Sequence, residues 1–230
     1  MTARAGGCFC AGADLKALAA GQDYEPWAGS ADGPCHDVLS KPVIAAIAGY
    51  ACAGGLGIAL FCDIRIIDDT AVFGVFSRRW GVPMSDGTTV RLPRVVGQGR
   101  ALDMLITGRA VGADEAMAIG LATRKVQRGT TRAEAERLAH QVAGFPQIAL
   151  RSDRRSAYDS FDGDTEAAIR REMELSLEAR RIEAQAGAAR FRQGAGRSGR
   201  FEDAGPERAQ TKEAPGPSST DGRNDPRRIV

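Results

Sequence analysis

The stretch from Lys41 to Asp68, KPVIAAIAGYACAGGLGIALFCDIRIID, constrains the fold more than any other part of the chain. It opens with a near-continuous apolar run, Lys41 to Gly49, which is typical of a strand buried on both faces. A glycine-rich turn and an apolar segment of helical length follow, and Ile64 to Asp68 reads as a second strand. Strand, turn, helix and strand form a βαβ unit, so we expect an α/β fold with a partly parallel sheet.

The second half of the chain is predicted to be largely helical. Gly108 and Gly120 each end a short helical pattern, and an amphipathic pattern from about 130 stops at Pro146. A longer pattern runs from Thr165 to Gly194. Its apolar stripe consists of Ile169, Met173 and Leu177. Charged residues, Gly, Pro and Ser dominate residues 195–230, so we expect a disordered tail there.

Composition excludes several classes of function. With 43% hydrophobic and 26% charged residues in 230, the chain can bury one core, and its formal charge of +2 gives no electrostatic reason to expect a nucleic acid or a membrane as partner. No signal peptide pattern and no apolar run of about 20 residues is present, so we expect a cytoplasmic protein. Five cysteines without a CxxC pair are interpreted as reduced thiols, and the Cys8–Cys10 pair lacks a histidine at ligand spacing, so no metal is expected.

Two stretches rich in small residues, FCAGADLK and GYACAGGLG, lie about forty residues apart. Each precedes a predicted helix, so each can present unpaired backbone N–H groups to an anionic oxygen. Two such donors that converge would form an oxyanion hole. The alternative is that both stretches are tight turns, in which Ala and Gly are present for space.

Five blocks of the sequence are similar to the enoyl-CoA hydratase/isomerase family, the crotonase superfamily. They are FCAGADLK, KPVIAAIAGYACAGGLGIALFCDIRI, Phe73–Gly74, GTTVRLPRVVG and ITGRAVGADEAMAIGLA, and they occur in the family's order from about Ala5 to Gly194. The resemblance implies an α/β domain over residues 1–194, with a spiral of ββα turns over 1–145 and a helical oligomerisation region over 146–194. It also implies homotrimers or dimers of trimers, and an acyl-CoA thioester as substrate with no separate cofactor.

The resemblance assigns roles to particular residues. The backbone N–H groups of Ala13 and Gly54 correspond to the oxyanion hole that meets the thioester carbonyl. Further substrate contacts are expected along the same loops, at Ala11, Gly12, Asp14, Lys16 and Gly55. Lys16 falls where similar proteins place a cation near the CoA phosphate, although a solvated surface lysine is an equal alternative.

The chain departs from the family at its proton-transfer positions. Hydratases of this family use two glutamates, and the corresponding residues here are Gly57 and Ser77. Asp86 lies within a residue of the position where certain isomerases and dehalogenases of the superfamily place an acid, so it is the candidate acid–base group. The alternative for Asp86 is ordinary turn and N-cap chemistry. A catalytic imidazole at His36 is a less favoured hypothesis.

Three bulky residues, Arg78, Arg79 and Trp80, fall in the segment expected to line the acyl pocket. They would recognise a polar acyl group or pair across a trimer interface, and we favour the interface. His140 is expected on a helix surface or at a packed edge.

The beginning of the chain is the second departure. Family members carry two strands, a helix and a third strand before the AGAD loop, whereas this chain starts at the end of that third strand. We therefore expect an incomplete spiral core, with an open edge and an exposed apolar face at the strand near Lys41–Gly49. Three functions stay open: an enzyme acting on acyl-CoA thioesters, a non-catalytic acyl-CoA binding protein, and a truncated inactive homologue.

Overall fold

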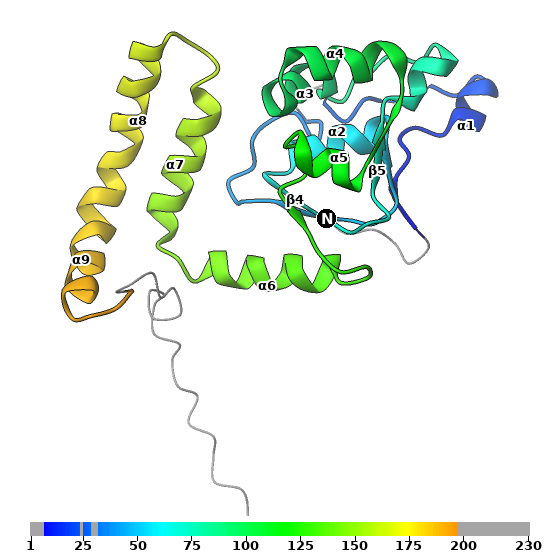
Figure 1. Cartoon of the computed structure of the whole chain (residues 1–230). Coiled ribbons are helices and arrows are strands. Elements are labelled where there is room, and N and C mark those ends of the chain that lie inside the picture. The colour runs from blue at the N-terminus through cyan, green and yellow to red at the C-terminus, as the bar shows by residue number, and fades with distance from the viewer. Residues whose placement is uncertain (1–6, 24, 29–31, 197–230) are drawn as a thin grey trace, which may run out of the picture.

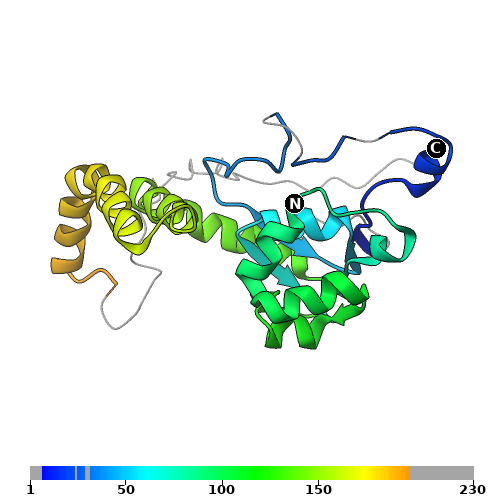
Figure 2. The same cartoon turned by 90° about the horizontal axis from the view of Figure 1, so that it is seen from above.

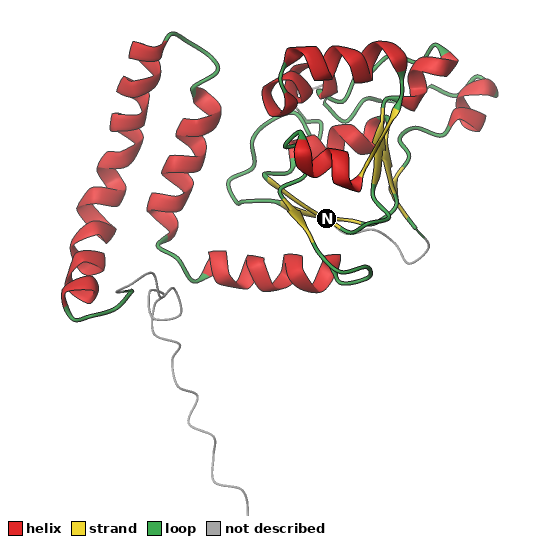
Figure 3. Cartoon of the chain, in the orientation of Figure 1, coloured by secondary structure: helices red, strands yellow, loops and turns green. Residues whose placement is uncertain are grey.

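The computed structural model describes residues 7–23, 25–28 and 32–196. Two small sheets and the helices around them form one body, and a helical arm extends to one side of it (Figure 1, Figure 3). The larger sheet has the order β1-β3-β5-β6 and the smaller one β2-β4-β7. The strands are β1 (Cys8–Cys10), β2 (Ile44–Ile47), β3 (Tyr50–Cys52), β4 (Ile64–Ile67), β5 (Val72–Gly74), β6 (Ala110–Gly112) and β7 (Arg124–Lys125).

Helices make up most of the remaining described structure. Those of the body are α1 (Leu15–Ala19), α2 (Gly54–Phe61), the 3₁₀ helix η1 (Phe76–Trp80), α3 (Thr88–Val96), α4 (Gln98–Thr107), α5 (Ala113–Ala118) and α6 (Thr131–Ala143). Those of the arm are α7 (Gln147–Asp159), α8 (Thr165–Ala179), the π-helical turn η2 (Arg180–Ala184) and α9 (Gln185–Arg192).

The predicted βαβ unit is confirmed, because β2 and β4 pair in parallel with Ile44 opposite Ile64. The run predicted as a strand, Lys41 to Gly49, contains β2, and a second strand that was not predicted, β3, follows it directly. Gly49 separates β2 from β3 with a positive φ of 66°, and a side chain there would overlap the carbonyl of Gly7. This bend transfers the chain to the second sheet, where β3 pairs with β1 and β5. Strand β3 cannot be recognised in the sequence, because its three residues lie inside what reads as a glycine-rich turn.

Helix α2 is surrounded by the core. Seven of its eight residues are buried, with Ile58 the exception, which explains why its sequence has no polar face. The core around it draws on both sheets and on helices α3 to α5. Its largest fully buried side chains include Phe73, Ile47, Leu56, Ile67, Leu92 and Met104.

The apolar face of β2 is covered, so the expectation of an exposed face is wrong. Ala45, Ala46 and Ile47 are each 1% exposed or less. On one side of the strand, Ala46 packs with Ala135 and Leu138 of α6. The amphipathic helix α6 therefore covers this face, although β2 is the outermost strand of its sheet among the described residues.

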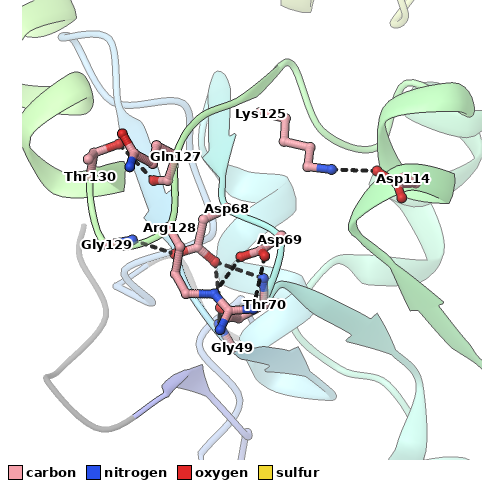
Figure 4. Close-up of polar contacts among 10 residues, drawn as sticks. All are labelled: Gly49, Asp68, Asp69, Thr70, Asp114, Lys125, Gln127, Arg128, Gly129 and Thr130. Carbon is pink, nitrogen blue, oxygen red and sulfur yellow. Dashed lines mark hydrogen bonds and ion pairs between the residues drawn. The ribbon is translucent and has the colours of Figure 1, made fainter.

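A polar network holds the bend at Gly49 (Figure 4). Asp68, at the end of β4, is buried and accepts hydrogen bonds from the N–H groups of Thr70 (3.0 Å) and Gly129 (3.1 Å). The hydroxyl of Thr70 in turn accepts from the N–H of Gly49 (2.9 Å). The end of β4, the β2–β3 bend and the loop before α6 are thereby joined.

The helices predicted in the second half are present. Gly108 and Gly120 follow α4 and α5 with positive φ, and the pattern from 165 to 194 forms α8, η2 and α9 in succession. The short strand β6 between α4 and α5 was not predicted. Helices α7 and α8 lie side by side in both views (Figure 1, Figure 2). The tail expected over 195–230 falls, beyond residue 196, outside the described residues.

A carboxylate of the body accepts two hydrogen bonds from the arm. Asp63, just before β4, accepts from Arg154 Nε (2.7 Å) and from the hydroxyl of Tyr158 (2.8 Å), both on α7. Its other oxygen accepts from the N–H of Val43 (2.6 Å). Burial, followed by the hydrogen bond to Asp63, raises the pKa of Tyr158 to about 12.

Candidate functional site

The two loops rich in small residues meet backbone to backbone. Parallel pairing of β1 with β3 brings their carboxyl ends to one edge of the sheet. A Cβ built on Gly12 would lie 2.8 Å from the nitrogen of Gly54, and one on Gly55 would overlap the carbonyl of Cys10. Gly12 also has a φ of +89°, so both space and backbone conformation require glycine there.

The meeting point presents two N–H groups. Ala53 precedes α2 with φ 50° and ψ −123°, a conformation that L residues rarely adopt, and Gly54 is the first residue of the helix. Within the described residues, the N–H groups of Ala13 and Gly54 have no hydrogen-bond acceptor. The start of α2 also carries the positive end of the helix dipole. These N–H groups can therefore donate to an anionic oxygen.

A cavity of about 250 Å³ opens beside these groups. Its wall is mostly apolar and comes from α1, β3, η1 and the segment after η1. The lining residues include Ala11, Ala13, Leu15, Tyr50, Cys52, Gly54, Phe76, Ser77, Trp80, Val82, Met84 and Asp86. Burial raises the pKa of the Cys52 thiol to about 12, so this thiol stays neutral and forms part of the apolar wall.

Asp86 supplies the one carboxylate among the described lining residues. It is 8% exposed, and its Oδ1 accepts a hydrogen bond from the N–H of Trp27 (2.8 Å). A Cβ built on Gly54 would lie 2.9 Å from Asp86 Oδ2, so this oxygen faces the first residue of α2. The residue that caps α3 is Gly87, and no side chain bonds to the helix start. The N-cap alternative for Asp86 is therefore wrong.

The space beside Gly57 is taken by Asp86. A Cβ built on Gly57 would lie 2.7 Å from Asp86 Cβ and 3.0 Å from the Asp86 carbonyl oxygen. The second glutamate position, Ser77, is buried, and its hydroxyl contacts Met84 Sδ at 3.4 Å. Neither position has a carboxylate, and the one carboxylate among the described lining residues comes from the turn before α3.

The other residues predicted to contact substrate are placed as follows. Ala11 lines the cavity, whereas Gly12, Asp14, Lys16 and Gly55 are not among its lining residues. Asp14 caps α1, because its Oδ1 accepts from the N–H groups of Lys16 (2.9 Å) and Ala17 (3.3 Å). Lys16 is exposed on the first turn of that helix.

The arginines of η1 are directed away from the cavity. Arg78 Nε donates to the carbonyl of Leu105 (3.2 Å), and Arg79 Nη2 donates to the carbonyl of Gly108 (3.0 Å) at the end of α4. Trp80 lines the cavity and is 70% exposed, so it forms part of the rim.

Neither histidine lines the cavity that holds Asp86. His36 belongs instead to a separate cavity of about 570 Å³ between α3 and α7, and His140 is exposed on α6. Trp27, which contacts Asp86, was missed by the sequence analysis, because no local pattern marks it.

Two features are absent from the described part of the chain. No group of three His, Cys, Asp or Glu side chains there has an arrangement that could hold a metal ion. No helix in the same residues has the length and apolar character that a bilayer crossing requires.

Comparison with known proteins identifies the family. A family model for enoyl-CoA hydratase/isomerase matches residues 1–194. A crotonyl-CoA hydratase from Syntrophomonas wolfei is 36% identical over 133 residues, which are 58% of this chain and 51% of that protein. A carnitinyl-CoA dehydratase from Proteus mirabilis is 39% identical over 145 residues, 62% of this chain and 56% of that protein. The chain thus spans between about half and three fifths of the length of these relatives.

Solved structures agree with this result. The crystal structure of an enoyl-CoA hydratase from Mycobacterium tuberculosis matches with a TM-score of 0.75 at 28% identity, covering 82% of this chain and 75% of that chain. One from Mycobacterium marinum also has a TM-score of 0.75, at 27% identity, with 84% and 77% covered. The predicted crotonase-like α/β fold is confirmed, and the chain belongs to the enoyl-CoA hydratase/isomerase family.

Proposed function

We propose that this protein binds an acyl-CoA thioester in the cavity beside α2 and stabilises the enolate of that thioester. The observation that carries the proposal is the meeting of the Ala13 and Gly54 N–H groups, which have no acceptor in the described part of the chain, at an apolar cavity that contains the carboxylate of Asp86. The thioester carbonyl oxygen would accept from both N–H groups, and the acyl group would lie against Phe76, Met84 and the other apolar lining residues.

The proposed chemistry follows from where charge develops. Removal of a proton next to a thioester carbonyl places negative charge on the carbonyl oxygen, and fixed amides directed at that oxygen need no reorganisation. One such donor typically contributes about 10²–10³ in rate. Asp86 would accept and return the proton, a role worth about 10²–10⁴. The reaction uses only groups of the chain and the coenzyme A ester itself.

A single carboxylate favours one class of reaction. Water addition in this family uses two glutamates, and here those positions are Gly57 and Ser77. Movement of a proton between two carbons of the acyl group needs one acid–base group. We therefore expect isomerisation of an unsaturated thioester to be faster than its hydration.

The second candidate function is acyl-CoA binding without catalysis. The observation that favours it is again the absence of a carboxylate at positions 57 and 77. Under this alternative, Asp86 would serve only to fix the segment of Trp27 above the cavity.

Assembly into trimers or dimers of trimers is part of the proposal. Three apolar side chains on α8 are at least half exposed in the single chain: Ile169, Met173 and Leu177. Burial of this stripe against other copies would recover free energy in proportion to the apolar area removed from water. Light scattering after size exclusion measures the mass, and a monomeric mass at micromolar concentration contradicts this part.

Turnover and binding separate the two functions. The purified full chain is assayed against crotonyl-CoA and a panel of enoyl and dienoyl thioesters, with Asp86→Asn as the test variant. Asp37→Asn is the matched control, because Asp37 is exposed and lies outside the cavity. Loss of turnover in Asp86→Asn alone supports the enzyme. Calorimetric binding of the thioester without any turnover supports the binding protein, and absence of both refutes the proposal.

A further inference from the structure

A closed ring of hydrogen bonds surrounds the Asp86 turn. The N–H of Trp27 donates to Asp86 Oδ1 (2.8 Å), and the carbonyl of Trp27 accepts from the N–H of Cys35 (2.9 Å). Arg91 closes the ring between Cys35 and Asp86. Its Nη2 donates to the carbonyl of Cys35 (2.6 Å), and its Nη1 donates to the carbonyl of Asp86 (3.2 Å). The ring thus connects α3, the turn before it and the segment between α1 and β2.

Arg91 acts on the backbone and not as a counter-ion. Both terminal nitrogens donate to carbonyl oxygens, and Nη2 also lies 3.4 Å from the carbonyl of His36. Its guanidinium lies over the ring of Phe61, 5.3 Å from the centroid, at the end of α2. Among the described residues, Arg91 forms no ion pair with a carboxylate. A hydrogen bond with a charged donor or acceptor is stronger than a neutral one, so the bonds from Arg91 and the bond from Trp27 to the Asp86 carboxylate are the strong links of the ring.

The turn leaves room for this guanidinium. Gly87 has a φ of +77°, and a side chain on it would overlap Nη1 of Arg91. A glycine after Asp86 is therefore required both by the backbone conformation and by the position of the arginine.

The ring also reaches the proposed oxyanion hole. A Cβ built on Gly54 would lie 3.5 Å from the indole of Trp27 and 2.9 Å from Asp86 Oδ2. The residue whose N–H holds the carboxylate thus also places its indole beside the first residue of α2.

We propose that Arg91 is a positioning residue for Asp86. It holds the Asp86 carbonyl directly, and it holds Oδ1 indirectly, through Cys35 and the N–H of Trp27. Loss of Arg91 would release both, so that the carboxylate would move relative to the thioester. This inference rests on the proposed function, in which Asp86 transfers the proton.

The kinetic test is a double-mutant cycle in the full chain, with the thioester of highest turnover. We expect Arg91→Met to lower kcat by about 10²-fold with little change in KM, because a displacement near 1 Å has an effect of this size. In an Asp86→Asn background, Arg91→Met should cause no further loss. Arg91→Lys should recover part of kcat. The control Arg94→Met, one turn further along α3, removes a side chain that contacts Phe161 and should leave kcat unchanged.

A kcat for Arg91→Met equal to that of the wild type overturns the inference, and so does an equal loss in both backgrounds. If Arg91→Met does not fold, Gly87→Ala displaces the same guanidinium and is put through the same cycle. Full kcat in Asp86→Asn refutes the proposed role of Asp86 instead, so the two failures differ.

A second measurement does not depend on activity. Amide hydrogen exchange, followed by NMR, reports the Trp27 N–H. We expect this amide to be protected in the wild type and in Arg94→Met. It should exchange faster in Arg91→Met and in Arg91→Lys, and the increase in its exchange rate should be smaller in Arg91→Lys. Unchanged protection of Trp27 in Arg91→Met overturns the inference even if no thioester is turned over.

Discussion

Replacement of Gly57 by alanine should destabilise this protein, although alanine is the better helix former. In an open helical position, the exchange of Gly for Ala stabilises by about 0.5–1 kcal/mol. At Gly57, however, the new Cβ would lie 2.7 Å from Asp86 Cβ and 3.0 Å from the Asp86 carbonyl oxygen. Overpacking of this kind costs about 1–3 kcal/mol. Because both contacted atoms are fixed close to the backbone, we expect a net loss of about 1–2 kcal/mol in the free energy of unfolding.

Urea denaturation followed by circular dichroism measures this difference. The matched control is Gly187→Ala on α9, where a Cβ would meet nothing within 4 Å, and this variant should gain about 0.5–1 kcal/mol. Asp86→Gly should relieve part of the cost of Gly57→Ala, because it removes the nearer contact. A Gly57→Ala protein at least as stable as the wild type, beside the expected gain in Gly187→Ala, would refute the idea that Asp86 fills the space of the family's glutamate.

Three other perturbations test separate parts of the structure. Asp63→Ala leaves Arg154 and Tyr158 without their shared acceptor and should cost about 3 kcal/mol in urea unfolding, with faster proteolysis of the arm; unaltered stability would contradict the role of this junction. Ala53→Gly should stabilise by about 1 kcal/mol, since it relieves a positive φ, and a clear loss would argue against that strain. Burial raises the pKa of Cys52 from 9.0 to about 12, so the folded state keeps a proton that the unfolded state loses, and stability should fall as the pH rises from about 9 towards 12. Cys52→Ala should reduce that slope by about 1.4 kcal/mol per pH unit, and an unchanged slope would show that the thiol does not titrate this way.

The elements that could be predicted are those with a local cause. Helices α4 and α5 end at Gly108 and Gly120 because only a residue tolerant of positive φ continues the chain there. The contact between the two loops agrees with one of the two interpretations of their small residues, because Gly12 and Gly55 lie where the two backbones meet. By contrast, β3 and β6 are three residues long, and no periodicity can be detected over so few positions.

Features that depend on distant residues could not be predicted. The covered face of β2 depends on α6, whose residues lie about ninety positions further along the chain. Similarly, only the fold shows that Arg78 and Arg79 donate to carbonyl groups near the end of α4, and their place at an interface between subunits stays a prediction. Charged side chains are long and flexible, so their direction is decided by the acceptors that the fold places within reach.

The sequence by itself determined the family, the order of the helices and the lack of glutamates at positions 57 and 77, because these are properties of residue identity and spacing along one chain. Only the tertiary structure decided what stands in place of those glutamates. Asp86 lies against Gly57 and Gly54 because α2 and the turn before α3 pack together, and it is held by Trp27 from 59 positions away. Such contacts arise from the packing of distant segments, which no local pattern encodes.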